Sequence, residues 1–177
     1  MRVLTALAIL LALSVLSLFV GVIDLSADAE AWSLVAVSRF PRTAAALITG
    51  ASLAVAGAIM QLLARNRFVE PMTAGTGQGA ALGILLVTIF APSASLGVKM
   101  LLASSTALIT SFGFLAIVRR LPVTQPILVP LVGLVYGGLI GAGVTFVAFP
   151  SDLLQYIEIW MSGEFSGLLQ GRYGLLW

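Results

Sequence analysis

The sequence predicts an all-α membrane protein, built from five transmembrane helices and short interfacial helices. Of its 177 residues, 60% are hydrophobic and only 9% are charged, and the mean hydropathy is +1.12. A soluble domain carries about 25% charged residues, so much of this apolar surface must face lipid. The apolar residues also fall into uncharged runs of roughly 20 residues, which is the length of helix that crosses the hydrocarbon core.

The five expected spans are residues 3–23, 43–64, 71–91, 97–118 and 123–149. The first run could also be a signal peptide with a cleavage site at Ala27-Asp28-Ala29. Its apolar stretch is longer than the usual signal core of about 7–15 residues, which favours a retained helix. Lys99, near the start of the fourth run, is close enough to the membrane surface for its ammonium group to reach water.

Two amphipathic segments, residues 26–40 and 151–162, are expected to lie along the membrane surface. In the second segment Leu153, Ile157 and Trp160 share one helical face, and the acidic and amide side chains share another. The whole chain, residues 1–177, is predicted to form one transmembrane domain, and it stops where a sixth span would begin.

Lysine and arginine in short loops set the orientation of a membrane protein. A cytoplasmic N-terminus would place five basic residues inside and four outside. The small excess, together with the close pairs Arg65/Arg67 and Arg119/Arg120, favours the N-terminus in the cytoplasm.

Glycine recurs at four-residue spacing in two of the runs. Small residues on one helical stripe allow backbones to approach closely in lipid, where hydrophobic burial does not drive helix association. The pattern therefore predicts a tightly packed bundle. The expected packing glycines are Gly50, Gly57, Gly75, Gly79, Gly83, Gly133, Gly137 and Gly141.

The chain lacks the residues that several kinds of functional site require. The chain has no cysteine and no histidine, so disulfides and the usual zinc or haem sites are not expected, and we expect no cofactor and no metal in this chain. No catalytic set can be assembled in the spans, which predicts a protein that is not an enzyme. The stretch "GTGQGAALG" lacks the preceding strand of a dinucleotide site, and no basic cluster points to nucleic acid. Neutral polar residues suit a path for a polar solute, and the candidates are Gln61, Gln78 and Tyr136.

The stretch "RFPRTAAALITGASLAVAGAIMQLLARNRFVEPMTAGTGQGAALG" resembles the permease subunits of type II ABC importers, the FecCD/BtuC-like family that moves ferric siderophores, haem and cobalamin. The later "WMSGEFSGL" resembles the family segment that follows helix five. Arg67, Phe68 and Glu70 depart from the commonest pattern, and this version resembles the branch that transports ferric catecholate-type siderophores. The matching positions are Pro41, Arg42, Ala46, Gly50, Ala51, Leu53, Ala54, Gly57, Gln61, Arg65, Asn66, Pro71, Gly75, Gly79, Ala80 and Gly83.

The resemblance implies the first half of a ten-helix permease in the bacterial cytoplasmic (inner) membrane. Its implied partners are the lipid bilayer, a second permease subunit (in a homo- or heterodimer), two cytoplasmic ATPases that hydrolyse ATP, an extracytoplasmic binding protein, and a ferric siderophore as substrate. A haem or cobalamin importer, and a truncated remnant that does not transport, are the alternatives. The residues expected near the cytoplasmic mouth are Arg65, Asn66, Glu70, Pro71, Arg119 and Arg120.

Overall fold

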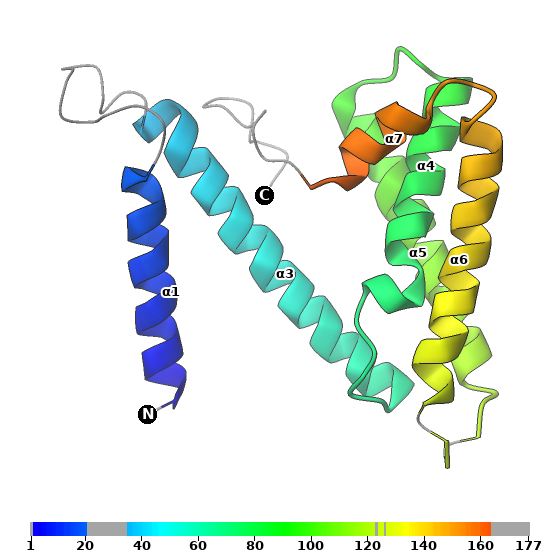
Figure 1. Ribbon diagram of the computed structural model, residues 1–177, viewed down its shortest axis with the longest axis horizontal. Coiled ribbons are helices and arrows are strands. Elements are labelled where there is room, and N and C mark those ends of the chain that lie inside the picture. The colour runs from blue at the N-terminus through cyan, green and yellow to red at the C-terminus, as the bar shows by residue number, and fades with distance from the viewer. Residues whose placement is uncertain (1, 21–34, 123, 126, 164–177) are drawn as a thin grey trace. The chain divides into compact units, whose positions relative to one another are not determined.

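Helices are the only regular elements in the part of the chain that the computed structural model describes, namely residues 2–20, 35–122, 124–125 and 127–163 (Figure 1). This confirms the all-α fold class. The backbone forms two compact units, which are described separately. The first comprises Met1–Ala51 with Phe165–Trp177, and the second comprises Ser52–Glu164.

The first unit pairs α1 (Arg2–Phe19) with the start of α3 (Phe40–Ala64), which follows a π-helical turn, η1 (Val35–Arg39). The Arg39 guanidinium donates hydrogen bonds to the carbonyl oxygens of Leu18 and Phe19, at 3.0 and 3.1 Å. These bonds satisfy carbonyls that the end of a helix leaves without intrahelical partners. Most apolar side chains of α1 are exposed, as expected for a helix whose solvent is lipid.

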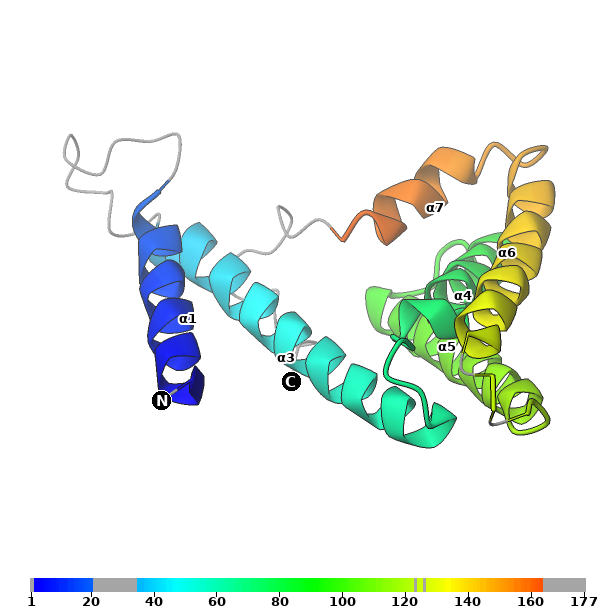
Figure 2. The same ribbon diagram turned by 60° about the horizontal axis from the view of Figure 1, so that its bottom comes forward.

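The second unit holds the end of α3 and a bundle centred on α4. Helix α4 contacts α5, α6 and α7, and Figures 1 and 2 show α4, α5 and α6 side by side. Helix α7, the next helix after α6, packs against α4 and α6 near the last turns of α6. The elements are η2 (Met72–Ala74), α4 (Thr76–Phe90), α5 (Leu96–Val118), α6 (Leu128–Ala148) and α7 (Leu154–Met161).

Two hydrophobic clusters form the core of the second unit. One lies at the end where α3 and α5 finish, and the other lies where α7 meets α4 and α6. The first consists of Met60, Ala64, Val69, Ala74, Phe114, Leu115, Val118 and Val129. The second consists of Ala81, Ile84, Leu85, Val144, Ala148 and Ile157.

The observed helices differ in places from the expected spans. Among the described residues, three helices are long and apolar enough to cross a membrane: Val35–Ala64, Leu96–Val118 and Leu128–Ala148. Val3–Phe19 and Thr76–Phe90 are apolar but shorter. The expected span 71–91 is interrupted because Gly75 has a left-handed backbone, with φ of 75°, between η2 and α4.

The start of the fifth expected span also differs. Helix α6 begins at Leu128, so Pro130 lies in its first turn, where a backbone N–H has no intrahelical partner to lose. Most of the expected interfacial segment 26–40, residues 21–23 of the first span, and Val123 and Pro126 lie outside the described residues. The division into spans and the single domain over 1–177 stay predictions.

Candidate functional site

The turn after α3 ends that helix with an arginine in a left-handed conformation. Arg65 has a backbone φ of 51°, a value that residues other than glycine rarely adopt. The Asn66 N–H donates to the Gln61 carbonyl at 3.1 Å, and the Arg65 N–H donates to the Leu62 carbonyl at 3.3 Å. This is the Schellman pattern of helix termination, which usually places glycine where Arg65 stands.

Buried side chains then fix the loop that leads to α4. Asn66 is only 5% exposed, and its Oδ1 accepts a hydrogen bond from the Phe68 N–H at 2.9 Å. Val69 is fully buried in the first hydrophobic cluster, and Thr76 Oγ1 donates to the Pro71 carbonyl at 2.6 Å. The loop is therefore held at both ends and in the middle.

Glu70 differs from its neighbours in this loop. It is one of the residues expected near the cytoplasmic mouth. Glu70 is exposed, and within the described ranges no ion pair joins it to a basic residue. Asn66 and Val69 are the side chains that fix the loop.

The turn after α5 carries the second pair of arginines. The N–H groups of Arg119 and Arg120 donate to the carbonyls of Leu115 and Ile117, at 3.0 and 2.9 Å, so the backbone continues in tight turns past Val118. Leu121 packs on the first hydrophobic cluster, and both arginine side chains are exposed. The packing of Leu121 therefore orders the backbone that carries the exposed side chains of Arg119 and Arg120.

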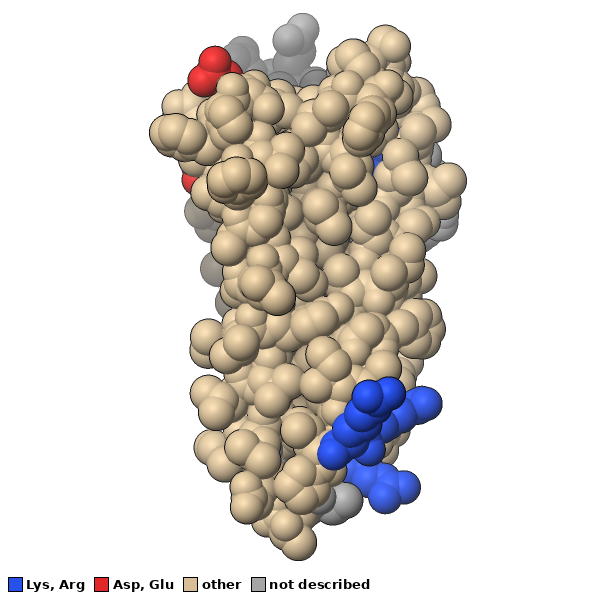
Figure 3. All heavy atoms as spheres, turned by 90° about the vertical axis from the view of Figure 1, so that its right-hand side faces the viewer, with Lys and Arg blue, Asp and Glu red and all other residues tan. Residues whose placement is uncertain are grey.

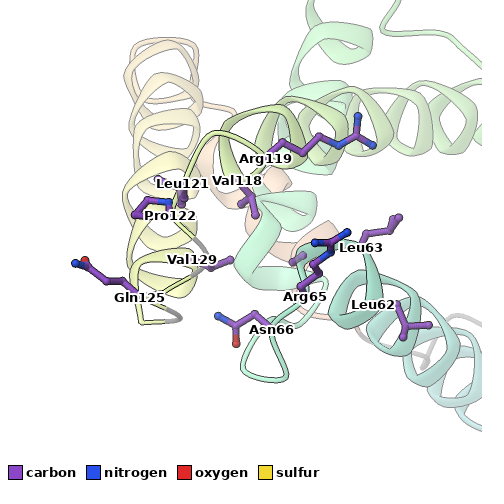
Figure 4. Close-up of a pocket in the computed structure, with 11 residues that line it drawn as sticks. Leu62, Leu63, Arg65, Asn66, Val118, Arg119, Leu121, Pro122, Gln125 and Val129 are labelled. Atoms are coloured by element: carbon purple, nitrogen blue, oxygen red, sulfur yellow. The ribbon is translucent and has the colours of Figure 1, made fainter.

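The two turns enclose a common pocket of about 470 Å³ (Figure 4). In Figure 4, Asn66 is directed from its loop toward Val129, and Arg65 lies beside it, on the same side of the pocket as Arg119. Four polar side chains line the pocket, Arg65, Asn66, Arg119 and Gln125. The remaining lining is apolar, from Leu62, Leu63, Ala64, Val118, Leu121, Pro122 and Val129.

Charge is distributed unequally between the two ends of the second unit. Figure 3 shows blue lysine and arginine atoms gathered at one end of the face in view and red acidic atoms at the other. The flank between them carries neither colour over most of its height. Arg119 and Arg120 follow the last residue of α5, whereas Lys99 is in its first turn. The pocket therefore lies at the arginine-rich end.

Gln61 and Glu70 line a second pocket, of about 440 Å³, beside the last turns of α3. Its other lining residues include Gly57 and Pro71, whose Cδ would stand 3.6 Å from a Cβ at position 57. The structure thus brings Gln61, a candidate path residue, next to the loop that carries Glu70.

Close packing of α4 on α5 occurs at two of the expected glycines. A Cβ on Gly79 would overlap Thr110 Oγ1 and stand 3.0 Å from the Thr106 carbonyl oxygen. A Cβ on Gly83 would stand 2.7 Å from the Leu102 carbonyl oxygen. Because backbone atoms are among these neighbours, a side chain at either position would push the helices apart.

The glycines of α6 contact residues on and before α4. A Cβ on Gly133 would overlap the Thr73 carbonyl oxygen, and one on Gly137 would be 3.6 Å from Gly75 Cα. A Cβ on Gly141 would be 3.4 Å from Gln78 Cγ. Gly50 differs, since no described atom lies within 4 Å of its Cβ position.

The other two path candidates lie inside this glycine-lined packing. The Tyr136 hydroxyl donates to the Thr110 carbonyl at 2.9 Å, and its ring lies 6.2 Å from that of Phe114. Gln78 contacts Gly137 and Gly141, and its Oε1 is buried without a hydrogen-bond partner among the described residues. A buried carbonyl oxygen without a hydrogen bond lowers the stability of the fold, so Gln78 stays a candidate polar residue of the path.

The sequence did not predict the polar contact between Lys99 and Tyr156. Lys99 Nζ donates to the Tyr156 hydroxyl at 2.9 Å and so joins α5 to α7. This hydrogen bond is the main reason that the pKa of Tyr156 is lowered, and partial burial opposes it. A lysine near a span end and a tyrosine on an amphipathic helix were the available signal, but their pairing depends on how α7 docks.

The described ranges contain no group of three or more His, Cys, Asp or Glu side chains that could hold a metal ion. The pockets are instead lined by arginine, amide and aliphatic groups, which suit polar contacts rather than metal coordination.

Apolar helices that pack through glycines and are joined by short turns, two of them rich in arginine, define a multi-pass membrane protein. Residues 4–177 match the profile described as the FecCD transport family, and the chain belongs to that family. It is thus a member of a family of ABC transporter permeases, which are not themselves enzymes.

The relatives include two proteins of petrobactin import. The chain is 42% identical to the petrobactin import system permease protein YclN of Bacillus subtilis (strain 168), over 96% of this chain and 55% of the relative. It is 37% identical to the petrobactin import system permease protein FatD of Bacillus anthracis, over 97% of this chain and 52% of the relative. The chain spans about half the length of the curated relatives that it matches.

A vitamin B12 import system permease protein, BtuC of Vibrio cholerae, is 37% identical over 89% of this chain and 50% of the relative. Among solved structures, a transporter described as of the metal-chelate ABC type, in an inward-facing conformation, matches with a TM-score of 0.65 and 28% identity. That match covers 96% of this chain and 55% of the solved one.

Proposed function

We propose that this chain is a membrane-spanning permease component of an ATP-driven system that imports a ferric siderophore, and that it forms part of the translocation path. The observation that carries the proposal is the family match over residues 4–177, together with relatives named for petrobactin import. The "RNRFVEP" turn supports iron over other cargo, because it resembles the branch associated with ferric catecholate siderophores.

The proposal assigns energy coupling to other subunits. Two cytoplasmic ATPases would hydrolyse ATP, an extracytoplasmic binding protein would deliver the substrate, and a second permease subunit would complete the path. The chain would supply one wall of the path, with Gln61 and Gln78 as candidate polar contacts.

We place the protein in the bacterial cytoplasmic membrane with its N-terminus in the cytoplasm. The support is electrostatic. The turns at Arg65 and Arg119 border one pocket and therefore lie at the same end of the second unit. Basic turns gather on the cytoplasmic side of membrane proteins.

Uptake of radioactive iron tests the proposal. The gene, expressed at its natural length in a bacterium whose own petrobactin permease has been deleted, is expected to restore uptake of iron-loaded petrobactin. The remaining components of that importer supply the ATPases and the binding protein. A matched strain with an ATPase that binds but does not hydrolyse ATP should show background uptake. Background uptake with the intact ATPase, for each of several ferric catecholates, would overturn the siderophore assignment.

Cobalamin is the second candidate cargo, because a vitamin B12 permease is also among the relatives. The corresponding experiment uses a strain that lacks its vitamin B12 permease and measures uptake of labelled cyanocobalamin. Restored cobalamin uptake without ferric-siderophore uptake would replace iron with cobalamin in the proposal.

A further inference from the structure

We propose that Lys99 is a positioning residue, whose ammonium group holds α7 in place against the bundle by pairing with the Tyr156 hydroxyl. Lys99 Nζ donates to that hydroxyl at 2.9 Å, and the contact joins residues that are 57 positions apart in the chain. It connects the first turn of α5 with the first turn of α7.

Helix α7 is too short to fix its own place. It has eight residues, and an isolated helix of about two turns is not stable by itself, so contacts with the rest of the bundle decide where it lies. Ile157 is buried in the second hydrophobic cluster. Apolar contacts have no preferred direction, so they allow a short helix to slide or roll on its neighbours. A directional contact is needed to give α7 one position.

The hydrogen bond from Lys99 supplies that direction. A hydrogen bond weakens when its distance or angle leaves a narrow range, and an ionised donor makes it stronger. Trp160, one turn further along α7, packs on Tyr156 with the ring centroids 6.2 Å apart, so the phenol is held where the lysine reaches it. Among the described residues no carboxylate pairs with Lys99, which leaves its ammonium group to Tyr156.

Lys99 does not stabilise its own helix through its charge. It lies in the first turn of α5, where the partial positive charge of the helix N-terminus repels a cation. Its backbone N–H donates to the Ser95 carbonyl at 3.1 Å, so the residue belongs to that turn. The favourable interaction of the ammonium group is therefore the contact with α7.

The position of α7 has a consequence at the start of α4, which the last residue of α7 reaches. Met161 Cε would stand 3.4 Å from a Cβ on Gly77, and Gly77 directly precedes Gln78, a candidate path residue. A shift of α7 would therefore change the surroundings of Gln78. This consequence rests on the proposed function, whereas the role of Lys99 in placing α7 does not.

Pulsed EPR spectroscopy on the protein expressed at its natural length tests the role of Lys99. Because residues 1–177 contain no cysteine, Ser93→Cys and Gln155→Cys place spin labels between α4 and α5 and on α7, once any cysteine elsewhere is replaced. We expect one main distance between the labels. Lys99→Met, which removes the charge and keeps a long side chain, should raise the fraction of molecules at other distances by about threefold, the factor that an average interhelical hydrogen bond is worth.

Two variants are the matched controls. Lys99→Arg keeps a cationic donor and should retain the main distance, which a role in filling space alone would not explain. Glu158→Gln removes a charge from α7 without touching the pair, and it should leave the distances unchanged. Unmodified distances in the Lys99→Met protein would overturn the proposal, as would an equal change in Glu158→Gln.

Tyr156→Phe keeps the ring that packs on Trp160 and removes the hydroxyl, so it should reproduce the change seen in Lys99→Met. Combining the two substitutions should add little, because both remove the same contact. Additive changes would show two separate contacts and contradict the pairing. Should Lys99→Met fail to fold, Tyr156→Phe gives the result alone.

Uptake of an iron–siderophore by the same variants tests the link to the path. We expect Lys99→Met to lower uptake per transporter in the membrane and Lys99→Arg to retain it. Normal uptake by a Lys99→Met protein whose α7 is displaced would refute that link. Absence of uptake by the unmodified protein would contradict the proposed function instead, and the spectroscopic result on α7 would still stand.

Discussion

Gly83 of α4 lies so close to Ala103 of α5 that a Cβ at position 83 would stand 2.8 Å from the Ala103 Cα. The two backbones are therefore in direct van der Waals contact. In lipid, such contact supplies packing energy that apolar side chains facing acyl chains do not. Helix α4 contacts both α5 and α6: its own Gly79 and Gly83 meet α5, and Gly75, just before α4, meets Tyr136 and Gly137 of α6.

Gly83→Ala should destabilise the protein by about 1–3 kcal/mol, because a methyl group there forces two backbones apart. Thermal unfolding in detergent, followed by circular dichroism, measures the effect. Gly138→Ala is the control, since no described atom lies within 4 Å of its Cβ position. It should be neutral or slightly stabilising, because alanine is the better helix former. Equal destabilisation by both changes would contradict close packing at Gly83.

Arg65→Gly should be about 1 kcal/mol more stable than Arg65→Ala, because only glycine adopts a φ of 51° without a steric cost. Both variants lose the same guanidinium, so the difference isolates the backbone. Chemical denaturation of the two proteins side by side gives the comparison. Identical stabilities would show that the left-handed turn carries no measurable strain.

Arg65→Ala and Glu70→Ala should each weaken iron–siderophore uptake in the complete transporter without abolishing membrane insertion. Neither side chain is buried, and Val69 and Asn66, which anchor the loop, remain in place. Uptake of labelled iron is compared with the amount of protein in isolated membranes. Normal uptake in both variants would remove the proposed role of this turn.

Tyr136→Phe should lower stability by about 0.6 kcal/mol, the average value of an interhelical hydrogen bond in a membrane bundle. The hydroxyl is already used inside the bundle, where it donates to the Thr110 carbonyl. Uptake per folded transporter should therefore stay unchanged. Reduced uptake at normal stability would instead place the hydroxyl in the translocation path.

Deprotonation of Tyr156 should begin at lower pH than that of an ordinary tyrosine, because the Lys99 ammonium, its hydrogen-bond donor, lowers the pKa of the phenol below 10.0. Ionisation then favours the folded state. The added stability is fully present above the unfolded pKa near 10, and it is lost as the pH falls through the lower folded pKa. Ultraviolet titration of the tyrosinate band, with Tyr156→Phe to identify the signal, measures the shift. Lys99→Met should reverse it, and a titration curve that Lys99→Met leaves unchanged would refute the pairing.

Composition and periodicity were enough to predict a helical membrane protein, because lipid leaves a spanning chain few ways to satisfy its backbone. They also located the two arginine turns, since charges seldom lie within a span. The resemblance in "RNRFVEPMTAGTGQGAALG" indicated the family, which the match over residues 4–177 shows.

Spacing identified glycine stripes, but it could not say which glycine meets a partner. Gly79 and Gly83 contact α5, whereas the Cβ position of Gly50 is open among the described residues, because contact depends on where another helix lies. The convergence of Arg65 and Arg119 on one pocket likewise joins residues that are far apart in the chain. The burial of Val69 and the hydrogen bond between Lys99 and Tyr156 also depend on how segments far apart in the chain pack together. A sequence pattern fixes the face on which a residue lies, and only the packed structure fixes what that face touches.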